Sequence, residues 1–187
     1  SMTTGSGNTA IGDGAMQSIT TNTILGAVAV GQYAFKGAAG TTTGANYTVA
    51  IGTDSLKALT TGAGNVAVGY EAGLALVEGQ YNTVLGHEAF EKAEEDAACT
   101  AIGYKSLFNA DVSNTGSSVS SHNSALGYFS GYQITTGKYN TALGSWTIGN
   151  SGGSVLTGDG NTCVGYKAGF DLTGDADENT IVGYLAG

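Results

Sequence analysis

A five-residue pattern that recurs along the whole chain constrains the fold more than any other feature. It reads Asn, a β-branched or small residue, a small or apolar residue, an aliphatic residue and Gly, as in residues 8–12 and 82–86. Some copies lack the Asn. Ten copies end at the anchor glycines Gly12, Gly31, Gly52, Gly69, Gly86, Gly103, Gly127, Gly144, Gly165 and Gly183. Tandem repetition of this kind indicates a stacked-repeat architecture.

The spacing of the anchor glycines defines the size of one repeat. The intervals are 19, 21, 17, 17, 17, 24, 17, 21 and 18 residues, so 17 is the base period. Longer intervals fit a constant coil with insertions in its turns, which solenoids tolerate. We therefore expect an all-β parallel solenoid of about ten 17-residue coils.

The residues before each anchor predict a strand that is covered on both faces. The residue directly before the anchor is aliphatic in all ten repeats, and the one before that is Ala in seven of them. Consecutive strand residues point to opposite faces of a sheet, and a strand that is apolar on both faces is typical of buried parallel sheets. One face can line the interior of its own coil. Without helices, the economical cover for the other face is another copy of the chain.

The remainder of each coil is predicted from its turn residues. A small side chain follows every anchor by three residues, which favours a tight turn. We expect a second short strand after it, over 56–59 or 90–93, and then a return turn. Gly62, Gly79 and Gly137 lie in the return turns, where they are expected to supply a positive φ.

The recurring asparagines have a structural interpretation. Stacked coils place Asn65 over Asn82 and Asn123 over Asn140, so their amides can hydrogen-bond along the rod and satisfy buried turn groups. We prefer this interpretation to a catalytic role.

Composition excludes several classes of protein. The chain has 187 residues with 32 Gly and no Pro, far from the one-third Gly and abundant Pro of collagen. A net charge of -9 opposes binding to nucleic acid or an anionic membrane surface. No apolar run approaches the roughly 18 residues of a membrane span, so we expect no membrane insertion.

The tandem Asn-Thr-Ala-Ile/Leu-Gly-x-x-Ala/Ser units with Thr-Thr-Gly turns resemble the head repeats of YadA-type trimeric autotransporter adhesins and related repeats of bacteriophage tail fibres. The resemblance covers residues 7–187. It implies a left-handed parallel β-roll, a homotrimer and a rod that displays binding surfaces to a cell. The adhesin repeat is shorter and more regular, so a virion tail fibre is favoured over a bacterial cell-surface protein.

Domain organisation follows from the repeat. Residues 1–2 are interpreted as a tag remnant and residues 3–187 as a single solenoid domain. Because the chain stops in mid-pattern, we expect it to be a fragment of a longer fibre.

Aromatic residues and inserted loops are the candidate binding features. A tyrosine directly follows the anchor at Tyr70, Tyr104, Tyr128, Tyr166 and Tyr184. These side chains are expected to form a broken row, either as stacking platforms for receptor glycans or as a packing ladder between coils or subunits. Insertions near 36–46, 108–122 and 149–160 are either binding loops or passive spacers.

Catalytic signatures are scarce, and we expect no enzyme activity and no cofactor. His87 and His122 are the only histidines, and His87 takes a position that is Tyr in five other coils. The alternative function is a glycan depolymerase, which needs paired carboxylates in a groove. Its most plausible donors, Glu71, Glu88 and Asp54, are scattered through the sequence.

Cysteines and acidic stretches give two smaller expectations. Cys99 and Cys163 lie several coils apart, too far for a disulfide, and Cys163 replaces a buried Ala. Alternate carboxylates over 171–178 are compatible with a weak calcium site, although the spacing of an EF-hand is missing and a solvated turn is the simpler interpretation.

Overall fold

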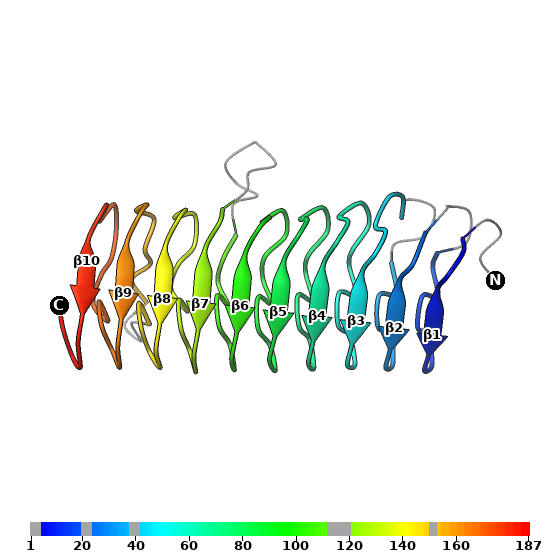
Figure 1. Cartoon of the computed structure of the whole chain (residues 1–187), viewed down its shortest axis with the longest axis horizontal. Coiled ribbons are helices and arrows are strands. Elements are labelled where there is room, and N and C mark those ends of the chain that lie inside the picture. The colour runs from blue at the N-terminus through cyan, green and yellow to red at the C-terminus, as the bar shows by residue number, and fades with distance from the viewer. Residues whose placement is uncertain (1–4, 20–23, 38–41, 112–120, 150–152) are drawn as a thin grey trace.

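The chain folds into one parallel sheet wound as a solenoid. The computed structural model describes residues 5–19, 24–37, 42–111, 121–149 and 153–187. Within these residues there are ten strands and no helix: β1 Thr9–Ile11, β2 Val28–Val30, β3 Val49–Ile51, β4 Val66–Val68, β5 Thr83–Leu85, β6 Thr100–Ile102, β7 Ser124–Leu126, β8 Thr141–Leu143, β9 Thr162–Val164 and β10 Thr180–Val182. They pair in chain order, so each coil adds one strand along a rod (Figure 1). The predicted all-β parallel solenoid is confirmed.

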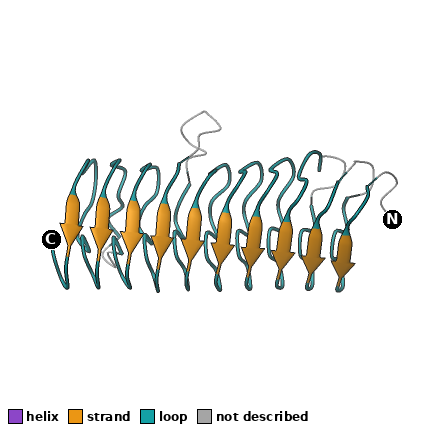
Figure 2. Cartoon of the chain, in the orientation of Figure 1, coloured by secondary structure: helices purple, strands orange, loops and turns teal. Residues whose placement is uncertain are grey.

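Every strand lies in the same register as its neighbours. Val68 pairs with Leu85, so the aliphatic residues before successive anchors are adjacent. The register survives the longest interval, of 24 residues, where Ile102 pairs with Leu126. Figure 2 shows the strands on one side of the coils, with turns and loops completing each coil. No helix in the described part of the chain has the length and apolarity to cross a membrane.

The predicted tight turn follows each strand. In the fifth coil the Ala89 amide donates to the Gly86 carbonyl oxygen at 3.4 Å, and Ala89 is fully buried. Where this position holds a hydroxyl, the interior can satisfy it, because Ser130 Oγ donates to the Ala142 carbonyl at 2.7 Å. The position is small because it faces the narrow interior of the coil.

The predicted second strand is wrong. Residues 56–59 and 90–93 form turns, and Leu56 and Phe90 have φ values of 47° and 56°. A backbone that enters the left-handed region cannot extend into a pleated strand. The coils still bond to one another here, since the Phe90 amide donates to the Ser106 carbonyl at 2.9 Å. Both side chains are fully buried, which offsets the cost of the left-handed conformation.

The expected role of the return-turn glycines is also wrong. Gly62, Gly79 and Gly137 are absent from the positive-φ residues, which instead include Gly64 and Tyr81, each directly before a ladder asparagine. A Cβ on Gly79 would run into the carbonyl oxygen of Asp96 in the next coil. Glycine is needed there for the close approach of two backbones.

The asparagine ladder is confirmed. Asn82 donates to Asn65 Oδ1 through both its backbone amide, at 2.9 Å, and its side-chain Nδ2, at 3.1 Å. The Asn140 amide donates to Asn123 Oδ1 at 2.9 Å. The side-chain Nδ2 of Asn65 also donates to the Gly79 carbonyl at 2.8 Å, so the ladder satisfies a buried turn group.

The ladder is interrupted at the sixth coil, where Cys99 takes the asparagine position. Its amide still donates to Asn82 Oδ1, at 2.9 Å. Its thiol lies 3.0 Å from Ser121 Oγ, which in turn donates to Asp96 Oδ1 at 2.7 Å. A buried thiol, hydroxyl and carboxylate thus replace the missing amide.

The core is a column along the rod axis. Small strand residues such as Ala67 and Ala101 line it from the sheet side. Larger side chains from the turns fill the remainder, and those that are fully buried include Leu56, Phe90, Leu107, Ile134, Ile148 and Leu156.

The anchor glycines are tested by comparing two of them. Both have a strongly positive φ, 146° at Gly86 and 138° at Gly183. A Cβ on Gly86 would lie 2.7 Å from the carbonyl carbon of Gly103, whereas the nearest atom to a Cβ on Gly183 is the Ala186 Cβ at 3.5 Å. Backbone strain costs roughly 1–3 kcal/mol at either site. Overpacking adds a further ~1–3 kcal/mol at Gly86 alone.

We therefore expect Gly86→Ala to lower the free energy of unfolding substantially more than Gly183→Ala, measured by urea denaturation. Equal losses in the two variants would show that the close approach between coils contributes nothing.

Candidate interaction surfaces

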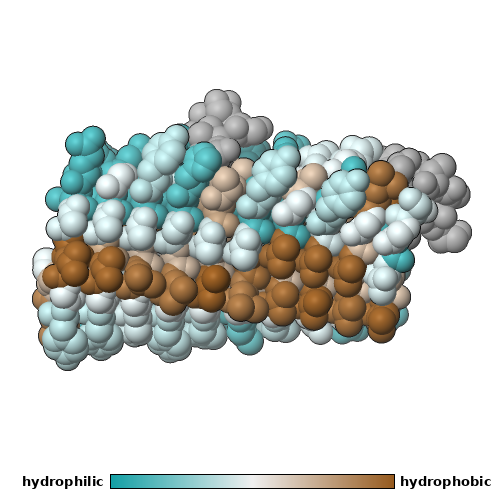
Figure 3. Space-filling model, viewed as in Figure 1, coloured by the Kyte–Doolittle hydropathy of each residue, from teal (hydrophilic) through white to brown (hydrophobic). Residues whose placement is uncertain are grey.

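The outward face of the sheet carries an apolar stripe, defined by the residue before each anchor glycine. The largest exposures belong to Ile11 at 60%, Val182 at 65% and Leu126 at 49%. Figure 3 shows the stripe as a continuous hydrophobic band along the rod. In β2 to β9 the residue two positions before the anchor is buried in the coil, as at Ala67. Within one chain the strands are therefore covered on their inner face only.

The stripe is hollowed near the middle of the rod. A shallow apolar recess of about 180 Å³ lies over β6, β7 and β8, with Leu126 and Leu143 in its lining. An apolar recess of this kind can receive side chains from another protein surface.

The predicted tyrosine row forms an aromatic ladder. Successive ring centroids are 4.8 Å apart between Tyr70 and His87, 5.6 Å between His87 and Tyr104, and 5.2 Å between Tyr104 and Tyr128. His87 thus takes the place of a tyrosine in the row. A separate pair, Tyr166 and Tyr184, stacks at 5.3 Å. The rings contact one another between coils, as the packing interpretation predicts.

The ladder joins a second ring cluster that the sequence analysis did not identify. Phe129 and Trp146 stack at 4.4 Å with an interplanar angle of 3°, and both follow their anchors by two residues. Phe129 also lies 4.7 Å from Tyr128 of the ladder. The signal was present in the sequence, because residues at the same distance from successive anchors lie beside one another.

Three carboxylates from neighbouring coils meet beside the ladder. One oxygen from each of Glu71, Glu88 and Glu91 lies within 4.8 Å of the others. Glu71 and Glu88 both follow their anchors by two residues, so the repeat brings together residues that look scattered in the sequence. Asp54, the third predicted donor, is not in this cluster and pairs with Lys57 at 3.1 Å.

Two basic side chains contact Glu88 of the cluster. Lys105 Nζ lies 2.9 Å from Glu88 Oε2, and His87 Nδ1 lies 3.0 Å from Glu88 Oε1. The hydrogen bond from Lys105 lowers the pKa of Glu88. Burial, followed by the hydrogen bond with Glu88, raises the pKa of Glu91. The pKa values of these two neighbouring carboxyl groups are therefore shifted in opposite directions.

The acidic stretch over 171–178 is organised by hydrogen bonds. Asp175 Oδ1 accepts from Thr157 Oγ1 at 2.6 Å, and Asp177 Oδ1 accepts from the Asp159 amide at 2.7 Å. Among the described residues, the grouping with metal-ligand distances is the glutamate cluster and not this stretch. The carboxylates of Asp175 and Asp177 therefore join neighbouring turns.

Both cysteines are buried and free, as expected. Burial raises the pKa of the Cys99 thiol to about 12 and that of Cys163 to about 11. Thiols with such pKa values are poor nucleophiles at neutral pH.

The three predicted loops are described only in part. Residues 38–41, 112–120 and 150–152 lie outside the described residues. Their interpretation as binding loops or spacers stays a prediction.

Comparison with known proteins adds no family. A scan of protein-family models, a search of curated proteins and a search of solved structures each return no match to this chain.

The carboxylate pair predicts a pH-dependent contribution to stability. A carboxyl group whose pKa is higher in the folded state contributes stability at low pH, and this stability is lost as pH rises through the folded pKa. We therefore compare the free energy of unfolding of Glu91→Gln with that of the unmodified protein. The difference should favour the variant more at about pH 7 than at about pH 4.

Because Glu91 is only partly buried, the effect should stay below about 1 kcal/mol. Thermal unfolding of both proteins at the two pH values measures it, with the exposed Glu78→Gln as the control. A variant whose relative stability is the same at both pH values would contradict the raised pKa of Glu91.

Proposed function

We propose that this chain is a non-enzymatic structural and adhesive fibre segment that works as a homotrimer. The observation that carries the proposal is the apolar stripe on the outward face of all ten strands. Association of the rod with other chains would remove this apolar band from water, which is favourable. A second and third copy of the same chain, with their rods parallel, would cover it along its whole length.

The stripe is suited energetically to association. Fully burying an aliphatic side chain contributes about 1.5–3 kcal/mol, so burying one that is already half covered contributes roughly 1 kcal/mol. Ten such positions per chain contribute roughly 10 kcal/mol, which is comparable to the ~4–15 kcal/mol cost of association. All ten stripe residues are aliphatic, so copies can approach without burying a charge.

The proposed trimer and its biological setting come from the resemblance of the repeat pattern. The Asn-Thr-Ala-Ile/Leu-Gly units resemble YadA-type adhesin heads and bacteriophage tail-fibre repeats, which implies three chains about one axis and a left-handed roll. We place the protein in a viral tail fibre that attaches to a host, with the bacterial cell surface as the alternative location. Three equivalent chains would convert weak contacts with a receptor into avidity.

The aromatic ladder is the proposed receptor surface of this fibre. Tyr70, Tyr128, Tyr166 and Tyr184 each expose more than two-fifths of their surface, so their rings are accessible in one chain. Tyr104 lies between them and is half-buried. A tyrosine ring offers an apolar face and a hydrogen-bonding hydroxyl, which fits a cell-surface glycan.

The trimer is tested by measuring mass with light scattering. We expect three times the mass of one chain for the unmodified protein. The double variant Leu126→Asp/Leu143→Asp places two charges in the recess of the stripe and should yield monomers, because an unpaired buried charge opposes association.

The matched control is Gln17→Asp/Gln80→Asp, which adds the same charge at exposed positions away from the strands. This control should stay trimeric. A monomeric mass for the unmodified protein would end the proposal.

A second candidate function is a glycan depolymerase, favoured by the glutamate cluster. Glycosidases use two carboxyl groups of different pKa, one protonated and one ionised. The pKa of Glu91 is raised and that of Glu88 is lowered.

The two functions differ in their products. A fibre that only binds should release no reducing ends when incubated with bacterial capsule or lipopolysaccharide. Release of reducing ends that is lost in Glu88→Gln, but retained in Glu78→Gln, would establish the depolymerase instead.

A further inference from the structure

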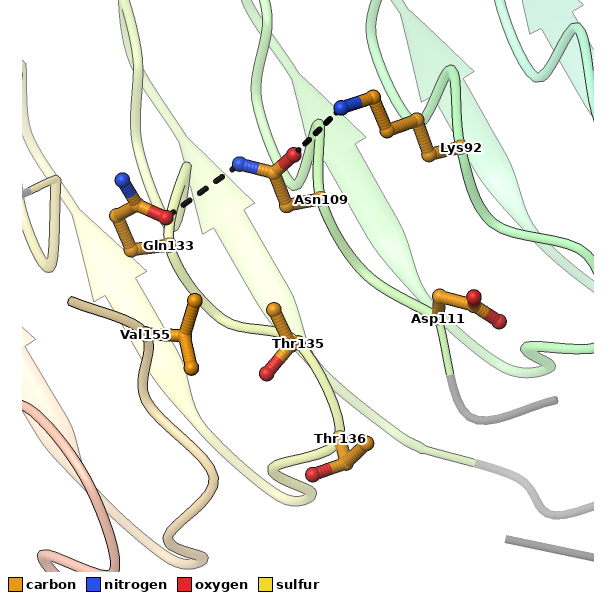
Figure 4. A pocket seen from close by; sticks show the side chains of 7 residues that line it. All are labelled: Lys92, Asn109, Asp111, Gln133, Thr135, Thr136 and Val155. Atoms are coloured by element: carbon orange, nitrogen blue, oxygen red, sulfur yellow. Dashed lines mark hydrogen bonds between the residues drawn. The ribbon is translucent and has the colours of Figure 1, made fainter. Parts of the chain in front are cut away.

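A groove lined mostly by polar residues crosses the middle coils and shares no lining residue with the recess of the apolar stripe. It has a volume of about 330 Å³ and is lined by side chains of consecutive coils from Lys92 to Val155 (Figure 4). Neither the aromatic ladder nor the glutamate cluster contributes to its lining.

One wall of the groove is a row of polar side chains. Lys92, Asn109 and Gln133 each follow their anchor glycine by six residues, so the coil repeat aligns them along the rod. Lys92 Nζ donates to Asn109 Oδ1 at 3.1 Å. Asn109 Nδ2 donates to the Tyr132 carbonyl at 2.9 Å and lies 3.5 Å from Gln133 Oε1. These bonds hold the row in one arrangement, which lowers the entropy cost of binding.

The fold itself does not require these polar side chains. The same position is Ala58 and Ala75 in the two preceding coils, and those coils keep the same strand register. The change from alanine to long polar residues coincides with the groove. This coincidence favours a binding role for the row.

The lining combines hydrogen-bond donors with acceptors and carries no net charge. The charge of Lys92 is cancelled by that of Asp111, in a chain whose net charge is -9. Thr135 and Thr136 add hydroxyl groups. Thr135 Oγ1 donates to the Leu156 carbonyl at 3.2 Å, and its oxygen retains lone pairs that can accept.

This chemistry matches ligand hydroxyl groups, which both donate and accept. An acidic protein repels polyanions, and the groove, in which the charges of Lys92 and Asp111 cancel, offers a polycation no net negative charge to bind. A neutral, hydroxyl-rich ligand fits best.

The geometry favours an extended ligand beside an aromatic surface. Coils repeat at about 4.8 Å along the sheet, so the row presents one polar side chain per coil. Lys92 Nζ of the row lies 4.9 Å from the centre of the Phe108 ring, which stacks on the Tyr132 ring at 5.2 Å. An aromatic ring beside a row of hydrogen-bonding groups suits the apolar face and hydroxyl edge of a sugar.

We propose that this groove binds a neutral oligosaccharide that lies along the rod across the row Lys92, Asn109 and Gln133. The inference rests on the adhesive function proposed above, and it names the class of receptor that the fibre would bind. It adds a second binding surface beside the aromatic ladder.

The test uses ligand-observed saturation-transfer NMR with a panel of neutral hexasaccharides, made of glucose, galactose, mannose or N-acetylglucosamine, and an oligogalacturonate as the acidic counterpart. We expect at least one neutral hexasaccharide to bind at about 1 mM or below, and the oligogalacturonate to bind more weakly. The double variant Lys92→Met/Thr136→Val should weaken that binding by at least about tenfold, because each substitution removes a hydrogen-bonding group from the groove.

The matched control is Lys57→Met/Thr61→Val. Thr61 occupies the same place in a Thr-Thr-Gly turn as Thr136, and both control residues lie outside the groove. The control should bind like the unmodified protein. Equal binding by the groove variant, stronger binding of the oligogalacturonate, or no binding by any neutral hexasaccharide would each overturn the inference.

Light scattering of the same samples separates this inference from the proposed fibre. If the protein is a trimer that binds no neutral hexasaccharide, the groove inference is overturned and the fibre proposal stands. If the protein is a monomer whose binding is lost in the groove variant, the trimer is overturned and the groove inference stands.

Discussion

The close approach of one anchor glycine to the next is the constraint on which the structure depends. At the end of each strand the backbone turns with a φ that L-residues rarely adopt, 146° at Gly86, and passes against the carbonyl group of the following anchor. A side chain at this point would separate the coils. Because the anchors stack directly, the strand before each one pairs in the same register, and insertions elsewhere in the coil leave the sheet unchanged.

The stacking of anchors also decides what each face of the sheet carries. The residue two before the anchor points into the coil, where space permits Ala67 or Ala101, and the residue directly before it points outward. The remaining interior is filled by larger side chains from the turns, such as Leu56 and Leu107. The stripe is therefore a direct product of the repeat, and its uniform aliphatic character is what the proposed contact with other chains would require.

Much of the fold could be predicted because it repeats. The strand ends, the small residue in the following turn and the Asn65–Asn82 ladder each follow from residue types that recur at one position. The second strand was predicted wrongly because Leu56 and Phe90 have apolar side chains typical of strands, while their left-handed backbone leaves no trace in residue type. The glutamate cluster is hidden for another reason, because Glu71 and Glu88 lie 17 residues apart in the sequence, although their shared distance from the anchor places them in adjacent coils.

In a solenoid each coil contacts only its neighbours, so a site is assembled from residues of consecutive coils. The aromatic ladder and the polar row of the groove use the same position of each coil, and the glutamate cluster adds Glu91 from a second position to the pair Glu71 and Glu88. Their groups repeat at the strand spacing of about 4.8 Å, which favours ligands that are themselves extended and repetitive. A scaffold that needs only glycine, alanine and an aliphatic residue at a few positions leaves the others free to vary. Specificity can therefore change from coil to coil, as from Ala75 to Lys92, without disturbing the register that holds the rod together.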